Sequence, residues 1–336
     1  MKKKILFLTM ASKTHGIGHL IRSLKLIKNL RKKNYYFYLV GLNRKYKKYF
    51  NRSLFKKIIF SDDYNPCSGN SLKFILSIKP DICIVDVPEP KLKFEKKLYD
   101  NKIKFFIYDN LTRKKIYSNF VINLNPTVSK KNYKAVNFKS NCKLLLGINY
   151  FQFDKKKDFE KKYQKVQNVI LFFGGGQIHL NLLKNILKSI SKTKLKNNNI
   201  FFVSKQKLEI EIKTNLKKIF GLKIIFFHNL STLDKVLTKS DLAIVTAGTI
   251  SFEASFNNVP MLLISIAKNQ KILAKSWSKL GAANYLGDYR SKNFSKKIDK
   301  AIKDILNENL RFQLYNSQKN IYKKYENKLV ELINKF

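Results

Sequence analysis

The stretch MASKTHGIGHLIRSLKLIKNL, residues 10–30, decides the fold. An apolar run from Ile5 to Leu8 precedes it and is typical of a buried strand. After Gly18 the apolar residues follow helical spacing, and the face they form is Leu20, Ile21, Leu24, Ile27 and Leu30. The sequence therefore predicts a strand, a glycine turn and a helix in direct succession.

Gly16 and Gly18 favour an anion site at this turn. Glycine allows positive φ and close approach of a ligand, and the first helical turn offers free amides at the positive end of the helix dipole. His19 begins the helix, where the positive end favours a neutral imidazole that can accept a proton. Because the spacing is not GxGxxG, both a ligand site and a simple helix-capping histidine remain open.

Length and composition predict two ordinary globular domains, since the chain has 336 residues and is 44% hydrophobic. Its formal charge of +46 points to nucleic acid or an anionic membrane. The excess is nearly all lysine spread along the whole chain, whereas base-reading surfaces rely on clustered arginine. We therefore expect no nucleic-acid partner and at most a weak contact with a membrane surface. The arginines are at 22, 31, 44, 52, 113, 290 and 311.

The cysteines, Cys67, Cys83 and Cys142, have neither CxxC spacing nor an even number, which favours a reducing compartment without a zinc site. The start MKKKILFLTMA is similar to a signal peptide, but polar residues soon interrupt its apolar run. No stretch approaches the ~20 apolar residues of a membrane span. We expect a cytoplasmic protein that needs neither a metal nor a cofactor.

The first half, residues 1–148, alternates strand-like and helix-like segments, which is typical of a doubly wound parallel sheet. Asp86 and Asp109 each follow an apolar strand pattern. Ligands of such sheets bind beyond the carboxyl ends of the strands. Each aspartate is therefore either a cleft residue or a turn or helix-cap residue.

The second half repeats this organisation without repeating the sequence. A charged linker, 149–166, leads into a domain over 167–310 and a final helix over 311–336. The strand from Val169 to Phe173 runs into Gly174-Gly175-Gly176, and a helical pattern follows. We therefore expect a second glycine turn suited to an anion.

The densest group of polar signals lies in residues 241–270. A strand ends before Ala247, Gly248 and Thr249, and Glu253 follows one helical turn later. Small residues and free amides suit a phosphate, and a carboxylate one turn along can accept hydrogen bonds from ribose hydroxyls. Asn269 and Gln270 follow the next strand, where amides suit hydroxyl or acetamido groups. Together these residues predict a nucleotide-sugar pocket.

These motifs, in this order, resemble the UDP-2,4-diacetamido-2,4,6-trideoxy-β-L-altropyranose hydrolases of pseudaminic acid synthesis. Spore-coat polysaccharide proteins and, more distantly, MurG-type UDP-N-acetylglucosamine transferases are also similar. The motifs are GIGH with Arg22, LLG at 145–147, FGG at 173–175, SDLAIVTAGT at 240–249 with Glu253, NVP at 258–260, and Asn269-Gln270.

The resemblance implies an α/β protein of GT-B type, with two Rossmann-like doubly wound parallel-sheet domains facing across a cleft. It implies that His19 is catalytic and acts on a water that attacks the anomeric carbon and releases UDP. It also implies no metal. The expected substrate-binding residues are Gly16, Gly18, Arg22, Asp86, Gly174, Gly175, Ala247, Gly248, Thr249, Glu253, Asn269 and Gln270.

Three functions remain open. The first is a hydrolase of a UDP-linked acetamido-deoxy sugar, and the second is a GT-B glycosyltransferase in which His19 deprotonates a sugar or lipid-linked hydroxyl instead. The third, motivated by the charge alone, is a non-catalytic or nucleic-acid-binding protein. Departures from the hydrolase pattern lie on the sugar and acceptor side: Asp86-Val87-Pro88 replaces Asp-x-Tyr, and Gly175-Gly176-Gln177 replaces GGTD.

Overall fold

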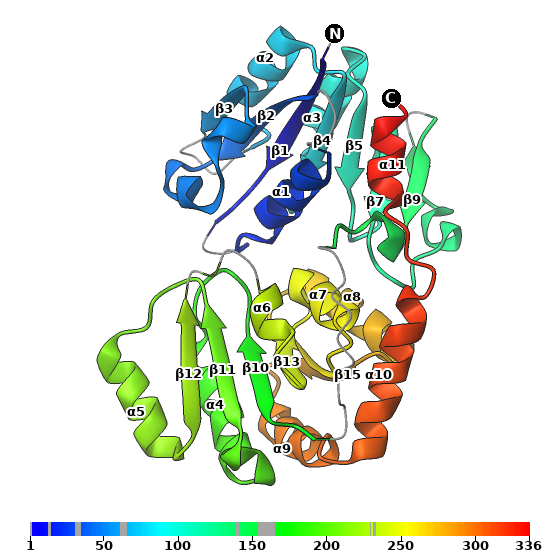
Figure 1. Ribbon diagram of the computed structural model, residues 1–336. Helices are drawn as coiled ribbons and strands as arrows, with labels where there is room; N and C mark the ends of the chain where they lie inside the picture. The colour runs from blue at the N-terminus through cyan, green and yellow to red at the C-terminus, as the bar shows by residue number, and fades with distance from the viewer. Residues whose placement is uncertain are drawn as a thin grey trace. The chain divides into compact units, whose positions relative to one another are not determined.

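The chain forms two compact units in its computed structural model (Figure 1). Unit 1 comprises Met1–Asp154 and Glu326–Phe336, and unit 2 comprises Lys155–Tyr325. The structure describes residues 2–12, 15–30, 35–60, 66–138, 141–153, 165–228, 230 and 233–336. Most of the linker predicted over 149–166 lies outside these ranges.

Unit 1 contains a parallel sheet of seven strands in the order β3-β2-β1-β4-β5-β7-β9. The chain winds outward from β1 to β3 and then returns to the other side at β4, so the strand order reverses between β1 and β4. The strands are β1 (Lys3–Thr9), β2 (Tyr35–Leu42), β3 (Lys57–Phe60), β4 (Ile82–Asp86), β5 (Phe105–Tyr108), β7 (Phe120–Asn123) and β9 (Lys143–Leu146), with a small separate pair, β6 (Lys115–Ile116) and β8 (Asn137–Phe138).

The helices of unit 1 connect these strands, and short 3-10 turns fill the remaining connections. The helices are α1 (Gly18–Leu30), α2 (Gly69–Ile78), α3 (Leu92–Asp100) and α11 (Lys328–Asn334), and the turns are η1 (Arg44–Tyr49), η2 (Arg52–Leu54), η3 (Lys130–Tyr133) and η4 (Ile148–Tyr150).

Unit 2 contains a parallel sheet of six strands in the order β12-β11-β10-β13-β14-β15. Its order reverses between β10 and β13. The elements are β10 (Asn168–Phe172), α4 (Leu180–Ser191), η5 (Lys194–Asn197), β11 (Asn199–Ser204), α5 (Ile210–Phe220), β12 (Lys223–His228), α6 (Asp234–Leu237), β13 (Leu242–Thr246), α7 (Thr249–Phe256), β14 (Met261–Ser265), α8 (Lys268–Lys279), β15 (Asn284–Asp288), α9 (Phe294–Asp304) and α10 (Glu308–Tyr322).

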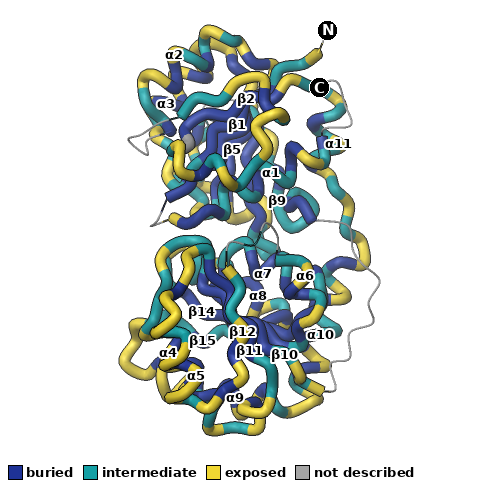
Figure 2. Tube along the Cα trace, turned by 60° about the vertical axis from the view of Figure 1, so that its left-hand side comes forward, coloured by how far each residue is buried: buried dark blue, intermediate teal, exposed yellow. Residues whose placement is uncertain are grey.

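The central strands are covered on both faces, which explains their uninterrupted apolar sequences. Every residue of β4 and β13 is buried, and Figure 2 shows the strands as the buried interior of each unit. The predicted doubly wound parallel sheets are therefore confirmed.

The buried face of α1 differs from the predicted apolar stripe. Leu20, Ile27 and Leu30 are buried as predicted, but Ile21 and Leu24 are only partly buried. Arg22 and Leu26 are buried as well. The helix is rotated toward the end of β4, where Arg22 finds a carboxylate.

The end of the chain forms two helices rather than the single helix predicted over 311–336. The helix α10 belongs to unit 2, and α11 belongs to unit 1. The side chain of Asn327 accepts a hydrogen bond from the Val330 amide and so starts α11 afresh. In unit 1, Phe336 packs edge-on against Phe106 and Phe120.

Candidate functional site

The first part of the candidate site lies at the reversal point of unit 1. The strands β1 and β4 are paired there, with Thr9 opposite Asp86. Ligands of doubly wound sheets bind outside the carboxyl ends of the strands at such a point. Gly16 has a φ of 71°, as the glycine turn required, and α1 begins at Gly18. His19 is therefore the second residue of the helix.

His19, Arg22 and Asp86 form one polar cluster at this point. His19 Nδ1 lies 2.7 Å from Asp86 Oδ1, and Arg22 Nε donates to Asp86 Oδ2 over 2.7 Å. A second guanidinium nitrogen of Arg22 donates to Asp86 Oδ1. Because a carboxylate only accepts, this contact assigns the Nδ1 proton of His19 to the bond, and in the neutral form of the ring Nε2 is then the acceptor.

The Arg22–Asp86 pair is buried and its charges stabilise each other. Asp86 is 0% exposed and Arg22 is 6% exposed, and the guanidinium lies 4.2 Å from the centre of the Tyr108 ring. Burial is the largest influence on the pKa of Asp86 and raises it, but Arg22 and His19 outweigh burial and the net pKa is lowered. Likewise Asp86 outweighs burial and raises the pKa of Arg22. The carboxylate is therefore charged at neutral pH.

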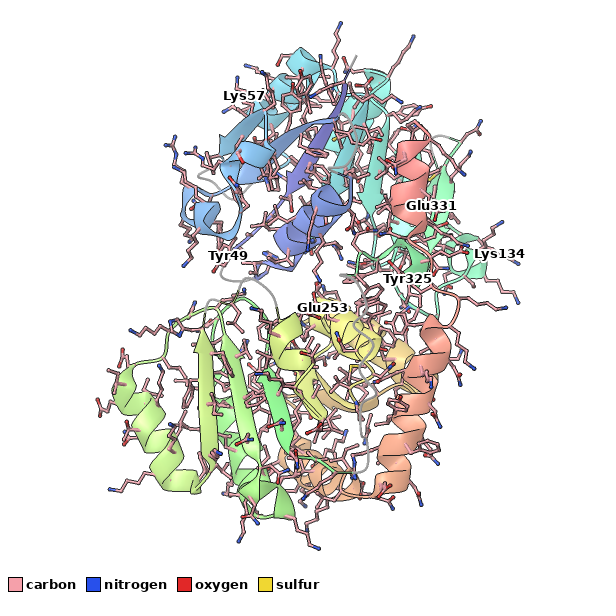
Figure 3. The ribbon with its side chains drawn as sticks, viewed as in Figure 1. Tyr49, Lys57, Lys134, Glu253, Tyr325 and Glu331 are labelled. Atoms are coloured by element: carbon pink, nitrogen blue, oxygen red, sulfur yellow. The ribbon has the colours of Figure 1, made fainter. Side chains whose placement is uncertain are left out.

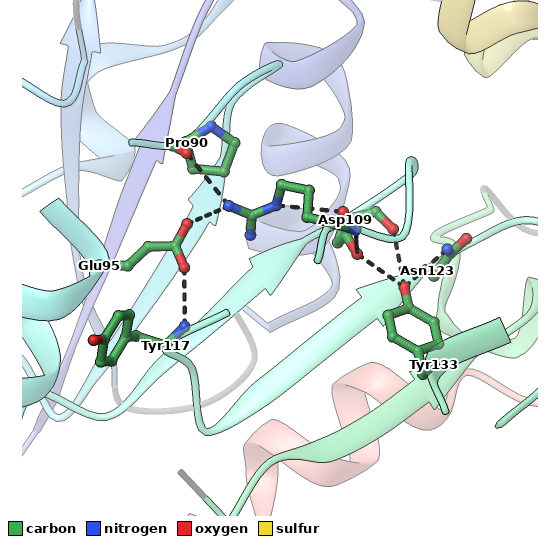
Figure 4. Close-up of polar contacts among 7 residues, drawn as sticks. Pro90, Glu95, Asp109, Tyr117, Asn123 and Tyr133 are labelled. Atoms are coloured by element: carbon green, nitrogen blue, oxygen red, sulfur yellow. Dashed lines mark hydrogen bonds and ion pairs between the residues drawn. The ribbon is translucent and has the colours of Figure 1, made fainter. Parts of the chain in front are cut away.

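Asp109, the second aspartate at a strand end, belongs to a different buried network (Figure 4). Arg113 Nε lies 3.4 Å from Asp109 Oδ1, and the Arg113 guanidinium donates to Glu95 and to the Pro90 carbonyl. The Tyr133 hydroxyl donates to Asp109 over 3.1 Å. Asp109 is 2% exposed and Glu95 is 0% exposed. The network ties the loop after β4 to the loop after β5.

Glu95 is a group in this network whose pKa departs from its usual value. Burial is the main cause and raises the pKa of Glu95, although the Arg113 charge opposes it. The network therefore holds a buried carboxylate beside Arg113 and braces the loop that leaves Asp86.

The second part of the candidate site lies at the reversal point of unit 2, between β10 and β13. Gly174 has a φ of 97°, and a Cβ built on it would lie 4.0 Å from Thr246 Oγ1. Gly248 is the N-cap residue of α7, and no side chain caps that helix end. Within the described part of the chain, a Cβ on Gly248 would meet nothing within 4 Å. The turn thus presents backbone toward open space.

The remaining predicted residues of unit 2 lie along the same edge, because β13 pairs with β10 on one side and β14 on the other. Glu253 is half-buried one turn into α7 (Figure 3). Asn269 is exposed, whereas Gln270 Oε1 accepts a hydrogen bond from the Ile266 amide over 2.9 Å. The oxygen of Gln270 thus supports the start of its own helix, α8.

Two histidines that the sequence interpretation left out also lie beside these turns. His15 Nδ1 is 3.1 Å from Ser12 Oγ, and burial, followed by the nearby His19, lowers the pKa of His15. His179 is the N-cap residue of α4 and its ring packs edge-on against Tyr289. Each histidine lies between a central strand, β1 or β10, and the helix that follows it. That position was the sequence signal that could have identified them.

Among the residues that the structure describes, no three His, Cys, Asp or Glu side chains are grouped as a metal site requires. None of the helices found there is both long and apolar enough to cross a bilayer.

Comparison with known proteins finds a family model that matches the second half of the chain. Residues 169–333 match the glycosyltransferase family 28 C-terminal domain. An uncharacterized protein of Methanocaldococcus jannaschii, MJ1062, is 25% identical over 331 residues, which are 95% of this chain and 66% of that protein. This chain therefore spans just under two thirds of the length of that curated relative.

Solved structures extend the likeness to the whole chain. Acinetobacter baumannii MurG has a TM-score of 0.66 at 13% identity, covering 99% of this chain and 100% of that one. A co-structure of S. aureus MnaA with UDP has a TM-score of 0.67 at 12% identity, covering 99% and 95%. The fold is thus of GT-B type, as predicted. The comparisons support a glycosyltransferase-like protein distantly similar to MurG and give the hydrolase prediction no support.

Proposed function

We propose that this chain is a GT-B glycosyltransferase that transfers a sugar from a UDP-sugar to a hydroxyl acceptor. The observation that carries the proposal is the imidazole of His19, oriented by a buried, charged carboxylate at the reversal point of unit 1. The family 28 match over unit 2 and the UDP in the MnaA co-structure support the choice of donor.

The proposed chemistry assigns a proton acceptor to unit 1. Nε2 of His19 takes the proton of the acceptor hydroxyl while the hydroxyl oxygen bonds to the anomeric carbon. The bond from that carbon to the diphosphate oxygen breaks, and UDP leaves with the bonding electrons. Asp86 stabilises the imidazolium that forms. A general base of this kind contributes about 10²–10⁴-fold to a rate.

Arg22 and Asp86 change role in this proposal. The sequence interpretation made both of them substrate-binding residues, but they are 6% and 0% exposed and bonded to each other. A buried guanidinium whose donors point at a carboxylate is poorly placed to neutralise a diphosphate. We therefore assign Asp86 to positioning His19, and Arg22 to positioning Asp86.

The donor is assigned to unit 2. The free amides at the start of α7 and the open space beside Gly248 suit the diphosphate. Gly174, Gly175, Ala247 and Thr249 would line it with small groups. Glu253 would accept from the ribose hydroxyls, and Asn269 with the amide nitrogen of Gln270 would face the sugar. These assignments keep the sequence predictions for unit 2.

Hydrolysis of the UDP-sugar is the second candidate, and one observation favours it. The GIGH motif with Arg22 resembles the hydrolase family, and an oriented His19 can deprotonate water as well as an alcohol. In that reaction UDP release needs no acceptor.

One assay separates the two functions. The pure protein is incubated with UDP-linked acetamido sugars, and free UDP is measured with and without a panel of sugar and lipid-linked alcohols. Transfer predicts UDP release that rises at least about tenfold with an accepted alcohol and is matched by a glycosylated product. Rapid release in water alone would establish the hydrolase instead.

Binding of UDP tests the donor assignment separately. Isothermal titration should show UDP binding that Glu253→Gln weakens about tenfold, as expected for one lost hydrogen bond to a charged group. Glu308→Gln is the matched control, since Glu308 is exposed in unit 2 at the start of α10. Equal affinities for both variants would contradict the ribose role of Glu253.

A further inference from the structure

Residues 44–60 form a strongly basic segment of unit 1. Seven of these residues are Lys or Arg and none is Asp or Glu, whereas the whole chain has 68 Lys plus Arg in 336 residues. Asp62 and Asp63 follow in the sequence, outside the described residues. We call this segment the basic–aromatic surface; its cations are Arg44, Lys45, Lys47, Lys48, Arg52, Lys56 and Lys57.

Aromatic rings accompany all seven cations of the basic–aromatic surface. Their charged groups lie 5.1–5.9 Å from the centres of rings. Phe60 alone has three such neighbours: Arg44 at 5.9 Å, Lys47 at 5.1 Å and Arg52 at 5.9 Å. The rings of Tyr49, Phe50 and Phe60 are half-buried, while Arg44 and Arg52 are exposed.

The fold places this surface at an edge of the sheet. It comprises η1, η2 and β3, and β3 is the edge strand beside β2. Figure 3 shows Tyr49, the last residue of η1, and Lys57, the first residue of β3, at separate places in unit 1. The positive charge therefore extends along one margin of unit 1 rather than around a single point.

We propose that the basic–aromatic surface docks unit 1 on the anionic leaflet of a lipid bilayer. Lipid headgroups present spread-out negative charge that attracts positive charge without requiring a fixed geometry, and each Lys or Arg near such a surface strengthens binding about fivefold. Partly buried aromatic rings are favoured at the level of the headgroups. The proposal does not depend on the proposed glycosyl transfer.

Charge complementarity and side-chain chemistry favour lipid over nucleic acid. Five of the seven cations are lysines, which act as point charges, whereas recognition of planar bases relies on arginine and free aromatic faces. The Phe60 ring already has three cations around it.

Sedimentation with vesicles tests the proposal on the full chain. The protein should bind vesicles of phosphatidylglycerol with phosphatidylcholine, fail to bind pure phosphatidylcholine, and dissociate at about 1 M salt, where screening reaches about 3 Å. The triple variant Arg44→Gln/Lys47→Gln/Arg52→Gln should bind the anionic vesicles about 100-fold more weakly, since three cations are lost.

Two further variants separate this surface from the general charge of the chain. Lys296→Gln/Lys300→Gln/Lys303→Gln removes three exposed lysines from α9 in unit 2 and should change affinity by less than about threefold. Arg44→Lys/Arg52→Lys keeps the charge and should retain binding, which guards against misfolding as the cause. Equal losses in both triple variants would overturn the proposal. So would the absence of binding to anionic vesicles, or a triple variant that loses only DNA binding.

Discussion

The two reversal points have the same arrangement of strand and turn but carry different side chains. Each follows a central strand, β1 or β10, and each has a glycine with positive φ in the turn after that strand, Gly16 or Gly174. In unit 1 the neighbouring strand ends in Asp86, which is fully buried and bonded to Arg22 and His19. In unit 2 the neighbouring strand leads to Gly248, where an added Cβ would meet none of the described residues within 4 Å.

Under the proposed function, this difference gives the two units different roles. A buried ion pair holds a neighbouring side chain such as an imidazole in one orientation, but both charges of the pair lose their hydration. An open turn with free amides adapts to a ligand and keeps its own side chains out of the way. We therefore expect substitutions in unit 1 to affect rate and folding, and substitutions in unit 2 to affect nucleotide affinity.

The largest effect should come from His19→Ala. Loss of the general base should reduce the turnover rate by about 10²–10⁴-fold while the affinity for UDP stays within about twofold. Steady-state kinetics and titration with UDP measure the two quantities on the same preparation.

Asp86→Asn and His228→Ala complete that experiment. An asparagine can donate to Nδ1 and so favour the wrong tautomer of His19, which should slow turnover nearly as much. His228 is an exposed histidine at the end of β12 and its loss should be neutral. Unchanged turnover in His19→Ala would show that His19 is not the general base and that the difference between the two units does not explain catalysis.

The next effect is on folding and concerns Arg22→Met. Methionine retains the apolar stem but leaves the Asp86 carboxylate buried without its partner, which should destabilise unit 1 by about 3–5 kcal/mol. Trp277, the one tryptophan of the sequence, is fully buried in unit 2. Urea unfolding followed by circular dichroism should therefore shift to lower urea, while the tryptophan fluorescence transition stays in place. A joint shift of both signals would show that the effect is not confined to unit 1.

The sheets were predictable from sequence because their central strands are covered on both faces. Continuous apolar runs such as β1, β4 and β13 follow directly from that burial. The strand β15 has the sequence NYLGD and only one of its residues is buried, so no apolar run marks it. This edge strand therefore carried no signal in the sequence.

The sequence indicated which residues lie in the turns, but it did not indicate which side chains or amides they contact. The pairing of Arg22 with Asp86 joins positions 64 residues apart, and it rotates α1 so that Leu26 is buried and Leu24 is only partly buried. The Gln270 side chain likewise accepts a hydrogen bond from the Ile266 backbone amide, and this bond competes with the sugar contact predicted for Gln270. Such partners depend on the tertiary structure and leave no local signal.

A smaller effect is expected from Gly248→Val in unit 2. The backbone of Gly248 has a φ of −117°, which valine adopts freely, and the added methyl groups would point into open space. Folding should be unchanged, while UDP affinity should fall about 10–100-fold if the diphosphate occupies that space. Titration with UDP and thermal unfolding measure the two quantities. Gly69→Ala is the control, because a Cβ on Gly69 also meets none of the described residues within 4 Å. Gly221→Ala at the end of α5 is unsuitable, because the φ of Gly221 is 59°. Retained affinity in Gly248→Val would place the nucleotide elsewhere.

The smallest effect at ordinary pH concerns the contribution of Asp86 to stability. Its folded-state pKa is lowered, so the stabilisation is fully present above the pKa of an unfolded aspartate, about 3.9, and is lost as the pH falls through the lower folded value. Asp288 in unit 2 also has a lowered pKa, caused first by hydrogen bonds from Arg290, but Arg290 is 60% exposed. Water screens that pair, and surface pairs contribute only about 0–1 kcal/mol. Urea unfolding between pH 7 and pH 3 should therefore show a steeper loss below about pH 4 in the wild type than in Asp86→Asn, and almost the same loss in Asp288→Asn. If Asp288→Asn flattened the profile and Asp86→Asn did not, the exposed pair would be the stronger one, and burial would not be what distinguishes the polar cluster of unit 1.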